Sequence, residues 1–108
     1  MCEHVDAIKN LDAILRTPGI DVLHIVANDL AQSMGFPPET QVREAMLGAI
    51  GKARAAGIGA GVGGNNPGDA ASVAALVKAG ANFVTISASG LLRLGAEHFR
   101  SAYDSALG

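Results

Sequence analysis

The feature that most constrains the fold is a short apolar run over residues 22–27, which ends abruptly at Asn28 and Asp29. A strand that is buried in a parallel sheet has this pattern, because both of its faces are covered. In α/β folds, ligands bind at the carboxyl ends of such strands. Asp29 therefore lies where a ligand would bind, and we expect a loop to run from it to Met34 and Gly35.

Helical patterns alternate with this strand and with two others along the chain. The predicted helices cover residues 5–16, 40–56, 69–78 and 91–107, and the predicted strands cover residues 21–27, 58–62 and 81–87. Thr40 is the expected N-cap of the second helix. The last helix is expected to pack through Leu91, Leu94, Phe99 and Tyr103. Strands that alternate with helices indicate an α/β fold with a parallel sheet and right-handed crossovers.

The length of the chain limits how much of an α/β fold it can form. The sequence has 108 residues, of which 49% are hydrophobic and 4% aromatic, a composition that suits helices packed on a parallel sheet. A closed (β/α)8 TIM barrel needs about 250 residues. We therefore expect a single domain over residues 1–108 that forms a partial barrel, roughly its last three to four βα units, with the amino-terminal half absent.

Charge and cysteine content argue against several kinds of partner. The net charge is −2, and the 8 basic and 10 acidic residues are spread singly, so no basic patch is available for nucleic acid. No apolar run approaches the roughly 20 residues of a membrane span. The single Cys2 cannot form an internal disulfide, and no leader pattern opens the chain, so the expected location is the cytoplasm.

Two carboxylates are the strongest candidates for a chemical role. The helical pattern from Val5 predicts that the chain begins at the end of a strand, so Glu3 and Asp29 each lie at the carboxyl end of a strand, one βα unit apart. Neighbouring strands lie about 4.8 Å from each other. Two facing carboxylates without a Lys or Arg partner repel, and the usual relief is either a raised carboxyl pKa or a bound divalent cation. Oxygen ligands favour a hard cation, Mg²⁺ or Mn²⁺. The alternative is structural: a solvated Glu near the terminus, and an Asp that caps a helix or turn.

The sequence around these two residues resembles a known family. The run MCEHVDAIKNLDAILRTPGIDVLHIVANDLAQSMG is similar to the carboxyl-terminal half of the HpcH/HpaI aldolases, the metal-dependent class II pyruvate aldolases. The resemblance places Glu3 and Asp29 on the two metal-binding positions of the family. It also places the backbone N–H groups of Asn28 and Asp29 where the family holds the carboxylate of the substrate.

The resemblance implies an aldehyde-lyase that cleaves a 4-hydroxy-2-oxoacid to pyruvate and an aldehyde through a metal-stabilised enolate. Mg²⁺ or Mn²⁺ would be the cofactor, acting as a Lewis acid. Glu3 and Asp29 would be ligands and not bases, so no catalytic residue is assigned in this chain. Members of the family form oligomers in which the last helix packs on a neighbouring subunit, so a homo-oligomer is expected.

The chain also departs from the family pattern. The Gly-Pro pair before the metal-binding Asp is replaced by Val26 and Ala27, and the Thr after the metal-binding Glu is His4. The family takes its catalytic His and Arg from the first half of the barrel. We therefore expect little activity from the isolated chain. The alternative is a non-catalytic barrel remnant, or a barrel half that associates with another half.

Other motifs in the sequence are weaker. Residues 59–64 match the dinucleotide pattern G-x-G-x-x-G, but little strand precedes them and no acidic residue lies at the required distance. His4 is expected at the surface, at a helix start, and His24 is expected to be buried and hydrogen-bonded. Cys2 has no paired base, so it is not expected to act as a nucleophile. Ser87 and Ser89 are expected to cap a helix more than to bind substrate.

Overall fold

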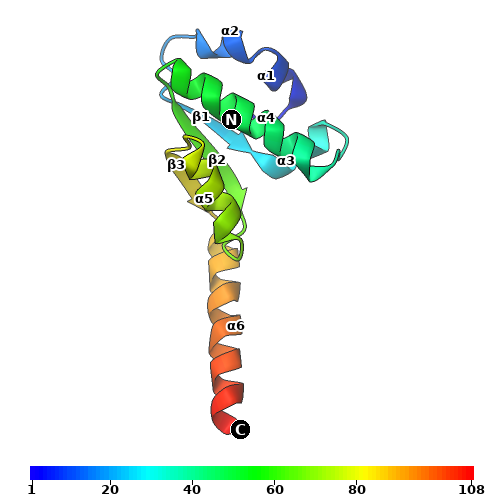
Figure 1. The fold of residues 1–108 in the computed structure, drawn as a ribbon, viewed down its shortest axis with the longest axis vertical. Helices are drawn as coiled ribbons and strands as arrows, with labels where there is room; N and C mark the ends of the chain where they lie inside the picture. Colours follow the sequence, from blue (N-terminus) through cyan, green and yellow to red (C-terminus); the bar gives the residue numbers. More distant parts are fainter.

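The computed structural model describes all residues 1–108 and shows a parallel sheet with helices packed mainly on one face (Figure 1). The elements in chain order are α1 (Val5–Lys9), α2 (Leu11–Leu15), β1 (Val22–Val26), α3 (Ala27–Ser33), α4 (Glu39–Ala55), β2 (Gly59–Asn65), α5 (Ala70–Lys78), β3 (Phe83–Ile86) and α6 (Ala88–Leu107). The predicted α/β fold class and the alternation of strands and helices are confirmed.

The three strands are parallel and lie in the order β1-β2-β3. Val22 pairs with Gly59 and Val26 with Gly63, while the ladder between β2 and β3 is irregular between Val62 and Asn65. Gly64 lies in this irregular stretch with φ 71°, a conformation that glycine adopts without steric cost. Consecutive parallel strands joined by helices are the βα units that the sequence predicted.

Two of the predicted helix boundaries are wrong. The single helix expected over residues 5–16 is divided at Asn10, whose side-chain amide donates to the carbonyl of Asp6 at 2.9 Å and so competes with the helical backbone. Thr40 is not an N-cap. It is the second residue of α4, whose N-cap is Pro38, and no side chain caps this end.

The region after β1 is helical, although a loop was expected there. Helix α3 begins at Ala27, directly after the strand, and ends at Ser33. Asn28 and Asp29 favour turns, which led to the wrong prediction. An acidic residue in the first turn also stabilises a helix through the helix dipole, and Asp29 occupies that position.

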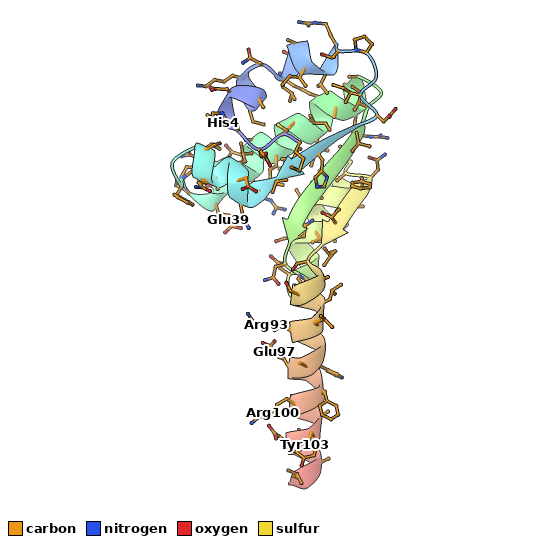
Figure 2. All side chains as sticks on the ribbon, turned by 180° about the vertical axis from the view of Figure 1, so that it is seen from behind. His4, Glu39, Arg93, Glu97, Arg100 and Tyr103 are labelled. Carbon is orange, nitrogen blue, oxygen red and sulfur yellow. The ribbon has the colours of Figure 1, made fainter.

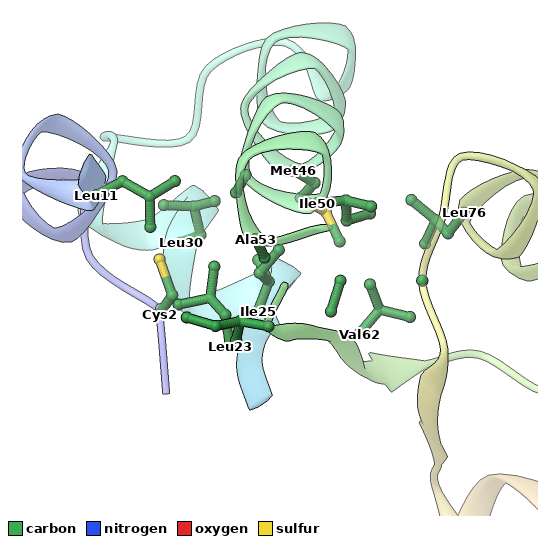
Figure 3. Packing of buried hydrophobic residues seen from close by; sticks show 14 of the residues in the cluster. Cys2, Leu11, Leu23, Ile25, Leu30, Met46, Ile50, Ala53, Val62 and Leu76 are labelled. Carbon is green, nitrogen blue, oxygen red and sulfur yellow. The ribbon is translucent and has the colours of Figure 1, made fainter. Parts of the chain in front are cut away.

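The core lies between the sheet and helix α4, which crosses one face of β1 and β2 (Figure 3). Ile25 and Val62 from the strands and Ile50 from the helix are fully buried. Residues 22–26 alternate in burial, with Leu23 and Ile25 directed to this core. Strand β1 is thus covered on one face by helix α4, whereas its apolar run predicted burial on both faces.

On the opposite face of the sheet, the side chain of His24 covers part of β2. The imidazole of His24 lies over Gly61 and Gly63 of β2, so closely that a Cβ atom at either position would overlap it. The ring also meets Phe83 of β3 edge-on, with 5.5 Å between the ring centroids. His24 Nδ1 is buried and has no hydrogen-bond partner, so the expectation that His24 is hydrogen-bonded is wrong at this atom.

Helix α6 extends away from the rest of the chain (Figures 1 and 2). None of its residues is buried, and Phe99, on its apolar side, is 70% exposed. The expected packing face of Leu91, Leu94, Phe99 and Tyr103 has no partner within the chain, because the helix leaves β3 without folding back onto the sheet. No helix of the chain has both the length and the apolar character needed to cross a membrane.

The contact between His24 and the glycines of β2 predicts the effect of adding a side chain to that strand. Gly63→Ala should lower the free energy of unfolding by about 1–3 kcal/mol, because the new methyl group overlaps the imidazole. Urea unfolding followed by circular dichroism measures this cost. In a His24→Ala background the same change should cost much less.

Gly51→Ala is the matched control for this substitution. Gly51 lies within helix α4 with open space around it, so alanine should raise the free energy of unfolding by about 0.5–1 kcal/mol. An equal loss for Gly63→Ala in both backgrounds would show that His24 is not the cause.

Candidate metal centre

The amino terminus is attached to β1 by two backbone hydrogen bonds. The N–H of Cys2 donates to the carbonyl of His24 at 2.6 Å, and the N–H of Val26 donates to the carbonyl of Cys2 at 3.3 Å. This is a parallel bridge, so Cys2 acts as a short fourth strand beside β1. Its side chain is buried in the core, which leaves Glu3 next to the carboxyl end of β1.

Asp29 reaches the same end of the sheet from helix α3. The helix follows β1 without a connecting loop, so Asp29 lies in its first turn and is exposed. Gln32 and Ser33 follow at the spacing of three and four residues that places side chains on one helix face. The helix therefore presents a row of polar side chains on the side where Glu3 lies.

Glu3 and Asp29 line one open hollow of about 390 Å³ together with His4, Gln32 and Ser33. The structure thus brings the two predicted carboxylates to one place, at the carboxyl end of β1. No lysine or arginine lines the hollow. Neither carboxylate has an ion-pair partner, whereas Asp12 of α2 pairs with Lys52 of α4 at 2.9 Å.

Ser33 fixes the wall of this hollow, and the sequence analysis did not identify it. Its hydroxyl accepts a hydrogen bond from the N–H of Val5 at 2.9 Å and donates to the carbonyl of Leu30 at 2.8 Å. The amino-terminal segment that carries Glu3 is thereby joined to the helix that carries Asp29. A helix prediction for this region would have placed Ser33 on the same helix face as Asp29, because the two residues are four positions apart.

His4 is at the surface and caps helix α1, as the sequence predicted (Figure 2). Its Nδ1 accepts a hydrogen bond from the N–H of Asp6 at 3.1 Å. The ring therefore has a structural role at the helix start while it borders the hollow.

The Cys2 thiol is held in its protonated form. Burial raises the pKa of the Cys2 thiol above its ordinary value; the amino terminus opposes this rise and the Glu3 carboxylate adds to it. A thiol in this state is a poor nucleophile. We therefore expect, as from the sequence, that Cys2 does not act as a nucleophile.

The donors in the hollow fit a hard divalent cation. Mg²⁺ is commonly bound through one or two carboxylates, with water and substrate completing its octahedron. Glu3 and Asp29 supply two such carboxylates. The chain has no cluster of three or more His, Cys, Asp or Glu side chains that could enclose a metal by itself. The remaining ligands would therefore come from outside these side chains.

Asn28 lies next to Asp29 in the first turn of α3. Asn28 and Asp29 are the second and third residues of α3, and Val26, the N-cap, forms no side-chain cap. Amides in the first turn of a helix have no acceptor within that helix. The side chain of Asn28 is exposed and does not line the hollow.

Comparison with known proteins identifies the relatives of the chain. Over 104 residues it is 36% identical to 2-keto-3-deoxy-L-rhamnonate aldolase of Salmonella paratyphi B, a match that covers 94% of this chain and 36% of that protein. Over 59 residues it is 44% identical to 4-hydroxy-2-oxovalerate aldolase of Rhodococcus jostii, covering 52% of this chain and 23% of that protein. No protein-family profile matches the chain.

The fold is similar to that of a solved structure from the same group. An HpcH/HpaI aldolase/citrate lyase family protein from Burkholderia cenocepacia superimposes with a TM-score of 0.79 and 28% identity, over 94% of this chain and 40% of that one. The chain is a homologue of the HpcH/HpaI aldolases. This HpcH/HpaI homologue spans about a third or less of the length of the curated relatives above.

The hydrogen bonds of Ser33 predict how the HpcH/HpaI homologue maintains its hollow. Ser33→Ala should lower the free energy of unfolding by about 1 kcal/mol and speed hydrogen exchange at the Val5 amide, because that N–H loses its acceptor. Chemical unfolding and amide exchange measure the two effects. Ser105→Ala is the control, since Ser105 bonds only to Ser101 on the exposed helix α6. Unchanged exchange at Val5 would contradict the assignment.

Proposed function

We propose that the chain is the carboxyl-terminal half of a class II aldolase barrel, in which Glu3 and Asp29 bind Mg²⁺ or Mn²⁺. The observation that carries this proposal is the hollow in which both carboxylates lie without a cationic side chain. The relatives support the reaction class, since the curated homologues are aldolases named for oxoacid substrates. The proposed reaction is the cleavage of a 4-hydroxy-2-oxoacid to pyruvate and an aldehyde.

The residues of the chain would bind and orient the substrate. When present, the cation supplies Lewis-acid stabilisation of the negative charge that develops as the carbon–carbon bond breaks. Glu3 and Asp29 would hold it at the carboxyl end of β1. The backbone N–H groups of Asn28 and Asp29 would donate to the substrate carboxylate, which the first turn of a helix also attracts.

A second candidate is a barrel half without activity of its own. Two observations favour it: only 17 of the 108 residues are buried, and one face of the sheet is open, with Val22 and Phe83 exposed. By the resemblance to the family, the catalytic His and Arg would be supplied by the amino-terminal half of the barrel. In either case we place the protein in the cytoplasm, where its single cysteine would remain reduced.

We also propose that α6 contributes to a homo-oligomer. Its Arg93–Glu97 and Arg100–Asp104 pairs neutralise one side of the helix, at 2.8 and 3.3 Å. The other side carries apolar residues that nothing in the chain covers, including Leu92, Phe99 and Tyr103. A neutral polar side with an uncovered apolar side suits a protein partner, whereas helices that bind membranes are rich in Lys and Arg.

Metal binding tests the proposed site directly. Isothermal titration of the chain with Mg²⁺ and Mn²⁺ should give a weak binding signal, because only two carboxylates are available. Asp29→Ala should abolish the signal. Glu44→Gln is the matched control, since Glu44 is an exposed carboxylate of α4 outside the hollow, and it should bind as the wild type does. No signal in the wild type would favour the non-catalytic candidate.

The isolated chain is predicted to have little aldolase activity even with metal bound. The groups that move the proton and hold the enolate charge would come from another barrel half, and removing such groups commonly costs several orders of magnitude in rate. A coupled assay that detects pyruvate released from a 4-hydroxy-2-oxoacid measures this. Robust turnover by the purified chain would show that its own residues are sufficient.

A further inference from the structure

The open face of the sheet has the character of a surface that is normally covered. The contacts around Gly59, Gly61 and Gly63 place the side chains of Val22, His24, Phe83 and Thr85 together on this face. Val22 is 41% exposed and Phe83 is 50% exposed. The buried Nδ1 atom of His24 has no partner within the chain. A partner that packs here would remove apolar surface from water.

This face is also free of charge. None of Val22, His24, Phe83 and Thr85 carries a fixed charge, and the strands β1, β2 and β3 contain no Asp, Glu, Lys or Arg. Two identical copies of the face could therefore approach without repulsion between like charges. Interfaces related by a two-fold axis bring the same surface patch together from both subunits.

Both edges of the sheet are available for further strands. Beyond β1, only the short bridge at Cys2 adds to the sheet, and β3 has no neighbour on its outer side. Unpaired edges readily accept strands from another chain. The strands are parallel, so the β3 edge of one copy and the Cys2 edge of another could pair in the same direction around a two-fold axis.

Strand number and chain length both fit two copies. Three strands and the Cys2 bridge provide four strand positions in each copy, and a closed parallel barrel has eight. The chain matches 40% of the related Burkholderia cenocepacia structure, so two copies together approach the length of one such protein.

From these observations we propose that two copies of this chain associate through the open sheet face and its edges to close a barrel. The inference rests on the partial barrel of the proposed function but not on its metal site. In the dimer, His24 and Phe83 of both copies lie inside the closed sheet, and helix α6 is not the main contact. The rim of the barrel then carries two copies of the Glu3 and Asp29 hollow.

Oligomeric state is the test, measured by sedimentation velocity and by light scattering over a micromolar concentration series. The wild type should form a dimer. Thr85→Asp should raise the dimer dissociation constant about tenfold or more, because the new carboxylates would be buried against each other. Thr85→Val should keep the dimer. Thr85 is exposed, and its hydroxyl forms no hydrogen bond in the chain, so both variants should fold.

A variant of helix α6 separates this interface from the alternative. Phe99→Asp disrupts the apolar side of α6. It should leave the dimer formed by the sheet faces intact and weaken only the further association that α6 is proposed to support. A dimer that is lost with Phe99→Asp and kept with Thr85→Asp would overturn the proposal, and so would a wild type that remains monomeric. As an independent measurement, hydrogen exchange of the β3 amides should slow as the wild-type concentration rises.

Metal titration of the wild type and of Thr85→Asp, together with their oligomeric states, distinguishes the proposed metal site from the proposed sheet interface. A dimer without metal binding would refute the metal site and leave the sheet interface standing. Metal binding by a wild type that remains monomeric would do the reverse.

Discussion

The backbone bridge between Cys2 and β1 is the interaction on which the candidate site depends. Its two hydrogen bonds place the amino terminus in register with Ile25 and bury the Cys2 side chain. Without them, the segment that carries Glu3 would not be attached to β1, and ligand binding would have to order it. The bridge makes that ordering part of folding, so the carboxylate is already in place beside Asp29.

One-sided packing explains why so much of the chain remains exposed. Helix α4 covers one face of the sheet and supplies Ile50 and Ala53 to the core. On the other face, His24 packs over β2, and its ring fits there only because residues 61 and 63 are glycines. A parallel sheet is usually covered on both faces. The sheet therefore has a layer of helix on one face, whereas its other face remains largely uncovered.

Much of the fold could be predicted from the sequence, because apolar periodicity is a local signal. The strand at residues 22–26 and the helices α4, α5 and α6 were predicted within a few residues of their observed bounds. The errors came where local preferences compete. Asn10 divides a helix by bonding to the backbone, and Asn28 and Asp29 favour turns in isolation but open a helix here. Whether such residues form a turn or a helix depends on hydrogen bonds and packing, which the pattern of apolar residues does not reveal.

For the site, the sequence determined which groups are available: two carboxylates that follow neighbouring strands, and no cysteine or histidine cluster. Only the tertiary structure decided that Glu3 and Asp29 line one hollow, that Ser33 joins their two segments, and that α6 leaves the sheet uncovered. The reason is physical. Residue type and periodicity are fixed by neighbours along the chain, whereas the meeting of two side chains is fixed by hydrogen bonds between segments that are distant in sequence.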